Sequence, residues 1–149
     1  MRVELLTDRD APAVVLRLTP LERLGALMLG DVEVPLSQLA SACAVDRPWR
    51  ERPWRGLRVG TGLPYVVLLG RLVVWPGSPA DFAAVFGRGP ALVLELLPGA
   101  PWRRVIASTP DAGQLAAALQ KAVAERTRKA ANAGAVVLKC EAGRSEAPH

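Results

Sequence analysis

Turn-forming residues interrupt the chain at short intervals up to residue 110, and this spacing limits the folds that are open to it. Glycine and proline cluster at 60–64, 76–79, 87–90 and 98–101, and they separate short apolar segments. Strands with turns about ten residues apart are typical of a β-sandwich or a small barrel. The chain after Thr109 has no such interruption for more than twenty positions, which favours a helix there.

Several of the short segments have the alternation of a strand with one buried face. Val14, Leu16 and Leu18 share one face, and Arg17 points the other way. Further strands are expected at 32–35, 40–45, 65–75, 82–86, 91–97 and 104–108. The glycine-rich residues 60–64 are expected to form a loop, and Gly70 to mark a bulge or a turn between two strands.

Two helix starts are visible. Thr19 and Glu22 have the spacing of a capping box around Pro20, which predicts a short helix. A longer amphipathic helix is expected over residues 111–131, with an apolar stripe of Leu115, Leu119 and Val123. Asn132, Ala133 and Gly134 are expected to end it.

Together these segments predict one mainly β domain over residues 1–131 and a flexible tail over 132–149. The domain would be a small barrel or sandwich of about seven strands, with the amphipathic helix covering an open end or face.

The order of strands followed by a helix, and several local residue runs, resemble an uncharacterised family of bacterial pleckstrin-homology-like (PH-like) proteins. The matching runs are 34–37, 48–49, 57–58, 60–64, 81–85 and 87–88. The resemblance implies a PH-like fold and no catalytic residues. It also implies a tendency to self-associate through sheet edges. The chain departs from the family by inserting residues 50–55 after the first Pro-Trp pair.

Residues for familiar kinds of catalysis are scarce. The only histidine is His149, the last residue, and the two cysteines, Cys43 and Cys140, lie far apart. A Ser-His-Asp, Cys-His or zinc site would need more of these residues within the fold. The carboxylate pairs Asp8/Asp10 and Asp31/Glu33 are expected at the solvated surface. We therefore expect no enzyme, no metal and no cofactor.

The residues around two tryptophans form the main candidate site. The set comprises Arg47, Trp49, Arg50, Arg52, Trp54, Arg55 and Arg58. Arginine forks and indole faces can bind phosphate and bases, which predicts a surface for anionic lipid or nucleic acid. Alternatively, the two tryptophan rings pack over an end of the barrel, with the arginines stacked on them, and pin loops at strand ends. The net charge of +5 is consistent with an anionic partner, but the arginine content also fits a GC-rich genome.

These observations lead to two hypotheses of function. The first is a non-catalytic binding or scaffolding domain that self-associates as a homo-oligomer or binds another protein. The alternative is a peripheral binder of anionic lipid or nucleic acid through 47–58. No signal peptide is visible, because the amino-terminal residues contain no apolar segment of the required kind. No transmembrane segment is visible either, because the longest apolar run, at 63–75, is short and contains Arg71. We therefore expect a cytoplasmic protein, with attachment to the inner face of the membrane as the alternative.

Overall fold

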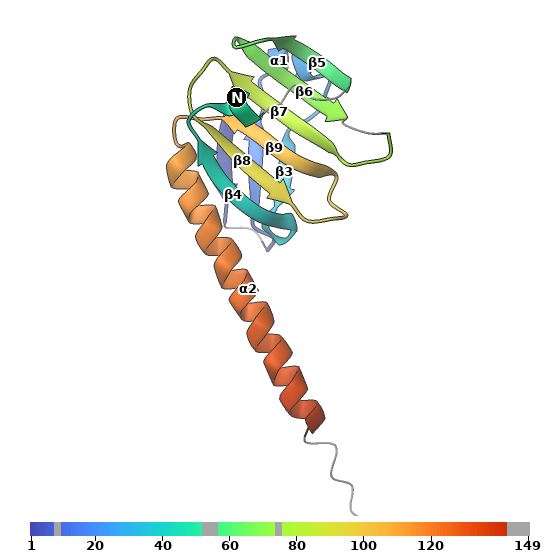
Figure 1. Cartoon of the computed structure of the whole chain (residues 1–149), viewed down its shortest axis with the longest axis vertical. Coiled ribbons are helices and arrows are strands. Elements are labelled where there is room, and N and C mark those ends of the chain that lie inside the picture. The colour runs from blue at the N-terminus through green and yellow to red at the C-terminus, as the bar shows by residue number, and fades with distance from the viewer. Residues whose placement is uncertain (8–9, 52–56, 74–75, 143–149) are drawn as a thin grey trace, which may run out of the picture.

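The computed structural model describes residues 1–7, 10–51, 57–73 and 76–142, without the side chains of residue 51 and residues 134–142. Within these residues, the chain forms nine strands, two α-helices and two 3-10 turns (Figure 1). The elements are β1 (Arg2–Leu6), β2 (Ala13–Arg17), α1 (Pro20–Ala26), β3 (Val32–Pro35), η1 (Leu36–Gln38), β4 (Leu39–Val45), η2 (Pro48–Glu51), β5 (Leu57–Leu63), β6 (Val67–Val73), β7 (Ala80–Phe86), β8 (Ala91–Leu96), β9 (Trp102–Ser108) and α2 (Ala112–Ala142).

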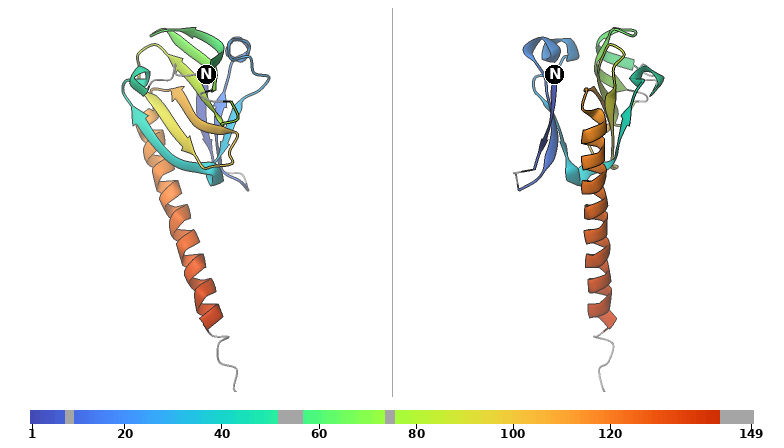
Figure 2. Two further views of the ribbon diagram at one scale, coloured as in Figure 1. Left: turned by 45° about the vertical axis from the view of Figure 1, so that its right-hand side comes forward. Right: turned by 90° about the vertical axis from the view of Figure 1, so that its left-hand side faces the viewer.

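The strands form two sheets that face each other as separate layers (Figure 2, right). The smaller sheet is antiparallel in the order β1-β2-β3. The larger sheet has the order β4-β8-β9-β7-β6-β5, and only the β7–β9 pair among its described ladders is parallel. The prediction of a mainly β protein with a C-terminal helix is confirmed.

The expectation of a closed barrel is wrong, and the structure has nine described strands where about seven were expected. The larger sheet ends at β4 on one side and β5 on the other, and among the described residues no ladder joins either strand to the smaller sheet. Pro35 and η1 turn the chain from β3 into β4, so that the two strands belong to different layers. β1 was not predicted, although Arg2, Val3, Glu4 and Leu5 alternate in polarity as in a half-buried strand.

Apolar side chains fill both faces of the larger sheet. One cluster lies between the sheets and includes Leu16, Val34, Phe82 and Leu94. The second lies on the outer face and contains Trp49, Leu68, Leu72, Ala83, Val85, Ala91, Val93 and Ile106. β7 is therefore buried on both faces, since its residues alternate between the two clusters.

The local predictions for the first helix and for β2 are confirmed. The Thr19 side chain accepts a hydrogen bond from the Glu22 backbone N–H, and the Glu22 carboxylate accepts one from the Thr19 N–H at 2.7 Å. Val14, Leu16 and Leu18 are buried in the inner cluster, whereas Arg17 is exposed. These signals involve neighbours along the chain, which is why the sequence revealed them.

The prediction of a loop at 60–64 is wrong for most of its length, and so is the prediction of a bulge or turn at Gly70. Gly60 lies at the centre of β5 and pairs with Gly70 in an uninterrupted register. Both have a positive φ, at 141° and 143°, and the Cα of each lies below 3 Å from where a Cβ on the other would stand. The two glycines let the β5 and β6 backbones approach closely in a conformation that other residues rarely adopt.

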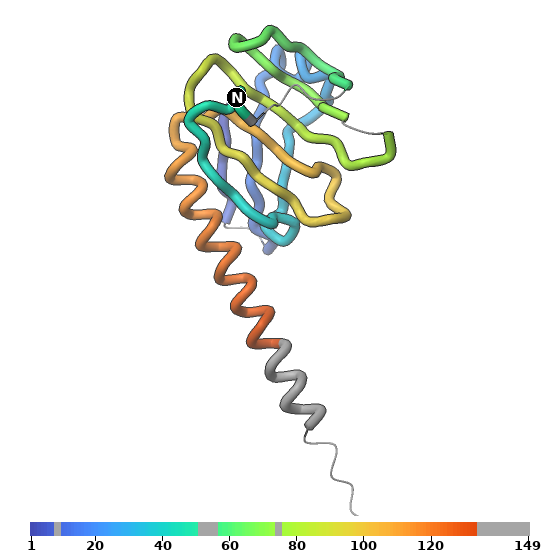
Figure 3. The backbone as a smooth tube through the Cα atoms, in the orientation of Figure 1, coloured from blue at the N-terminus to red at the C-terminus, as the bar shows by residue number. Residues whose placement is uncertain are grey.

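Helix α2 begins where the sequence predicts and ends later. Leu119 is buried, and Leu115 and Val123 pack against the inner cluster, so the apolar stripe is confirmed as part of the core. Rather than covering a barrel mouth, α2 lies along β4 and β8. It continues past Asn132 to Ala142 (Figure 1), and its part before residue 134 already projects beyond the sheets (Figure 3).

The prediction that Asn132, Ala133 and Gly134 end the helix is wrong, because α2 continues to Ala142. A single Gly costs a helix only about 1 kcal/mol relative to Ala, and five of the eight residues at 135–142 are Ala, Leu, Lys or Glu, which are good helix formers. Residues 143–149 of the predicted tail lie outside the described residues.

Candidate functional site

The predicted site is split between a buried tryptophan and exposed arginines. Trp49 is 6% exposed and belongs to the outer apolar cluster. Its indole Nε1–H donates to the Gly87 carbonyl at 2.6 Å, which fixes η2 to the turn after β7. Trp49 is thus buried and pins a turn, as the alternative interpretation expects, but it lies on the outer face of an open sheet rather than over a barrel end. Arg52, Trp54 and Arg55 lie outside the described residues.

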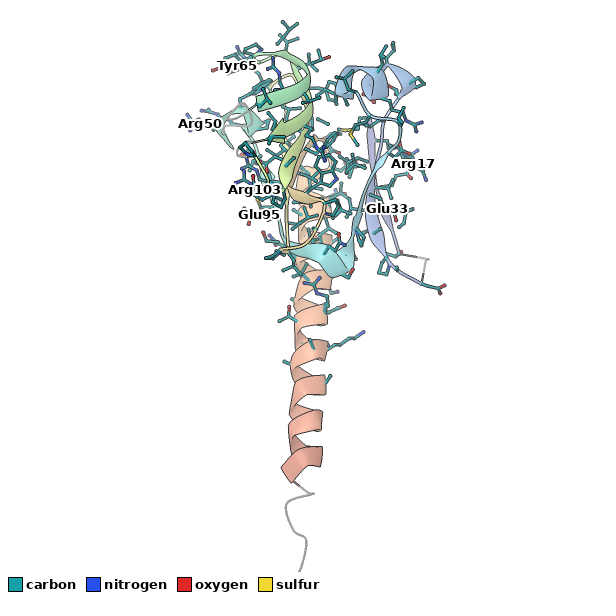
Figure 4. All side chains as sticks on the ribbon, turned by 90° about the vertical axis from the view of Figure 1, so that its right-hand side faces the viewer. Arg17, Glu33, Arg50, Tyr65, Glu95 and Arg103 are labelled. Atoms are coloured by element: carbon teal, nitrogen blue, oxygen red, sulfur yellow. The ribbon has the colours of Figure 1, made fainter. Side chains whose placement is uncertain are left out.

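The three described arginines of the predicted site remain at the surface. Arg47 and Arg50 flank Trp49 in η2 and the turn before it, and both are exposed, as is Arg58 in β5. Within the described part of the chain, no carboxylate or carbonyl engages the guanidinium of Arg47, Arg50 or Arg58. Figure 4 shows Arg50 on the same side of the molecule as Tyr65 and Arg103, opposite Arg17 and Glu33.

A pocket of about 270 Å³ lies beside Trp49, where the β5–β6 hairpin ends. Its lining consists of Trp49, Arg58, Gly62, Leu63, Pro64, Tyr65, Val67 and Leu68, so that Arg58 supplies its charge. Arg58, Gly62 and Leu68 share the outer face of the sheet, because Gly62 pairs with Leu68 and Arg58 lies four residues before Gly62, an even spacing along the strand. The pocket thus joins an apolar floor to one guanidinium.

Arg58 lies directly over Gly62. A Cβ at position 62 would stand 2.3 Å from the Arg58 Nη1 and 2.7 Å from its Cζ. The absence of a side chain at Gly62 is therefore what lets the Arg58 side chain lie flat along β5. Sequence reasoning singled out Arg58 but missed this role of the glycine.

Tyr65 forms the outer wall of the pocket in an unusual backbone conformation. The Val66 N–H donates to the Leu63 carbonyl at 3.0 Å, and Tyr65 has a φ of 64° in this tight turn. A turn with Pro64 at its second position and a positive φ at its third usually has Gly there, and another residue in this region costs about 1–3 kcal/mol. The Tyr65 ring lies 5.5 Å from the Trp49 ring, and the Arg88 guanidinium lies 5.5 Å from the Tyr65 centroid.

The Pro-Trp-Arg run of residues 48–50 and 53–55 occurs a third time at 101–103, where it has a structural role. Trp102 packs on Phe82 at 5.4 Å between ring centroids, and Arg71 lies 5.1 Å over the Trp102 ring. Arg103 forms two hydrogen bonds to the buried Asp81 carboxylate, at 2.8 and 2.7 Å, and Asp81 raises the pKa of Arg103. This triplet begins β9 and supplies packing and an ion pair at the start of that strand.

Several described carboxylates serve as structural acceptors. The Asp31 carboxylate accepts a hydrogen bond from the Leu18 N–H at 2.9 Å and one from Arg23 at 2.8 Å. The Leu18 hydrogen bond, followed by Arg23, holds the pKa of Asp31 below its usual value. A hydrogen bond from Arg17 likewise lowers the pKa of Glu4. Among the described residues, no three metal-ligating side chains gather at one place.

The described helices also lack the apolar length that would cross a bilayer. No protein-family model, curated protein or solved structure matches the chain, so the outer-face pocket and the exposed arginines carry the functional argument.

Proposed function

We propose that the protein is a non-catalytic binding domain, related to the PH-like proteins, that self-associates through the exposed edge of β5. β5 has β6 on one side and, in the described part of the chain, no strand on the other. It is seven residues long, contains neither Pro nor Lys, and keeps an unbroken register with β6. Edge strands of soluble proteins usually carry a proline, a lysine or a bulge, since these features prevent pairing with another chain.

Apolar side chains beside this edge add to the surface. Leu57 and Leu63 of β5 are 72% and 58% exposed. Helix α1 contacts β5, and the Thr61 hydroxyl donates to the Gly25 carbonyl at 3.0 Å. This helix and the turn after it expose Leu21, Leu24, Leu27 and Leu29. Contiguous exposed apolar side chains of this kind mark interaction surfaces.

The residue order of β5 favours a second copy of the chain as the partner. Antiparallel pairing of two copies centred on Gly60 places Arg58 opposite the partner's Gly62, so like charges do not face each other. The same pairing places Leu57 opposite the partner's Leu63, on the face that bears the α1 leucines. Cross-strand apolar pairs contribute about 0.2–1 kcal/mol each, whereas directly opposed like charges would be unfavourable. The β5 edge is the observation on which the proposal rests.

Size-exclusion chromatography with light scattering tests this proposal. We expect a concentration-dependent dimer, and Val59→Lys should weaken it by roughly tenfold or more, because pairing centred on Gly60 places the two lysines diagonally across the strand pair, where like charges repel each other. Leu97→Lys is the matched control, since Val59 and Leu97 are both 40% exposed. A strict monomer at millimolar concentration, or equal weakening by both variants, would contradict the proposal.

A second candidate function is binding to phosphate-bearing surfaces, either anionic lipid or nucleic acid. The exposed Arg47, Arg50 and Arg58 favour it, because the described residues offer them no acceptors. Its expected signature is affinity that falls steeply with salt and falls again in Arg47→Gln/Arg50→Gln. Sedimentation with phosphatidylserine vesicles measures binding to anionic lipid, and oligonucleotide titration at low salt measures binding to nucleic acid. No binding to either would exclude this function.

A further inference from the structure

We propose that the pocket beside Trp49 binds an apolar group that carries a carboxylate, with Arg58 as the carboxylate-binding residue. This inference concerns the single chain and does not require self-association, although Arg58, Gly62 and Leu63 also belong to the β5 edge of the proposed dimer. The pocket lies on the outer face of the β5–β6 hairpin, and Val59, which tests the dimer, lies on the opposite face of β5.

The size and lining of the pocket define the apolar part of the ligand. Drug-sized ligands occupy about 300–1,000 Å³, so a pocket of about 270 Å³ takes a smaller group. A single aromatic ring on a short chain fits this limit. Trp49, Leu63, Tyr65 and Leu68 provide apolar and aromatic contacts for such a ring.

Arg58 defines the polar part of the ligand. It is the charged group of the pocket lining, and among the described residues no acceptor occupies its guanidinium. A guanidinium binds a carboxylate through two parallel N–H···O bonds. Arg88 lies over the neighbouring Tyr65 ring and increases the positive potential at the pocket mouth. A phosphate group would bind more tightly to several converging cations than to one guanidinium that lies over apolar side chains.

Two features indicate that the arrangement is prepared for a ligand. Gly62 leaves the space in which the Arg58 side chain lies, with a Cβ position only 2.3 Å from Nη1. Tyr65 keeps a φ of 64° at a turn position that glycine would occupy at lower cost. Backbone strain at a pocket wall is typical of sites where the side chain is needed.

Isothermal titration calorimetry with 3-phenylpropionate, and with its neutral amide as the comparison, tests the proposal. We expect the carboxylate to bind about tenfold more tightly than the amide, because charge-assisted hydrogen bonds are roughly twice as strong as neutral ones. Arg58→Gln should remove this difference and leave amide binding unchanged. Gly62→Ala should weaken carboxylate binding as well, since a Cβ there displaces the flexible end of Arg58.

Arg71→Gln is the matched control. It removes the same charge from the adjacent strand, on the other face of the sheet, and should leave carboxylate binding intact. Thermal unfolding of each variant confirms that the fold is retained. The proposal is overturned if neither probe binds saturably, if Arg58→Gln keeps the preference for the carboxylate, or if Arg71→Gln is as harmful as Arg58→Gln.

The same chemistry has two natural sources, a free aromatic acid and the C-terminus of a peptide that ends in an aromatic residue. Titration with a short peptide ending in phenylalanine, as the free acid and as the C-terminal amide, distinguishes them. Tighter binding of the peptide acid than of 3-phenylpropionate identifies a peptide C-terminus as the ligand. Weaker binding of the peptide identifies the free acid.

Discussion

Replacement of Gly70 by Ala tests the close approach of β5 and β6 on which the whole hairpin depends. The new Cβ would lie 2.3 Å from the Val59 carbonyl oxygen and 2.9 Å from the Gly60 Cα, and both are backbone atoms. The φ of 143° adds a cost of about 1–3 kcal/mol, and overpacking adds about 1–3 kcal/mol more. We therefore expect Gly70→Ala to lower the free energy of unfolding by about 2–6 kcal/mol.

Thermal unfolding followed by circular dichroism measures this loss as a fall in Tm of roughly 5–20 °C for a chain of this length. Gly89→Ala is the control, because a Cβ at Gly89 meets no atom within 4 Å and its φ is ordinary. Both variants restrict the unfolded chain equally, so their difference isolates the contact in the native state. A Gly70→Ala protein within about 0.5 kcal/mol of the wild type would refute the reasoning.

Three further predictions concern other parts of the fold. Gly113→Ala, at an open position in the first turn of α2, should raise the free energy of unfolding by up to about 1 kcal/mol in urea titrations; a loss of stability would contradict the helix assignment. Asp81→Asn should cost about 1.5–3 kcal/mol in the same assay, because it weakens the two hydrogen bonds from Arg103 to a buried carboxylate, and an unchanged midpoint would show that the pair contributes nothing. The lowered pKa of Asp31, caused first by the Leu18 N–H, contributes stability that is present above the ordinary pKa of the carboxyl and is lost as the pH falls through the lowered value. Tm should therefore decline in acid, and an Asp31→Asn protein with an equally steep decline would exclude this group as a cause.

The sequence predicted the elements whose signals lie within a few residues of one another. The Thr19 capping box, the alternation of β2 and the leucine stripe of α2 depend on spacings of two to four residues, and the structure contains all three. The expected strands at 91–97 and 104–108 correspond to β8 and β9 for the same reason. For the candidate site, the sequence identified Trp49 and Arg58 but not their relation.

The sequence did not predict the roles of Tyr65 and Gly62 in the pocket, because each role depends on contacts with side chains outside its immediate sequence neighbourhood. The Tyr65 ring meets Trp49, and Gly62 matters only because the Arg58 side chain lies over it. A turn signal was visible at Pro64, but the sequence does not say what the tyrosine after it would contact.

By itself, then, the sequence determined the mainly β character, the capped first helix and the amphipathic final helix, because hydrophobic period and capping are local properties of the chain. Only the tertiary structure decided that the sheets stay open, that β7 pairs in parallel with β9, and that Gly60 faces Gly70. It also decided that Trp49 is buried on an outer sheet face. These features depend on which strands become neighbours, and that choice is made by packing between segments that are far apart in the sequence.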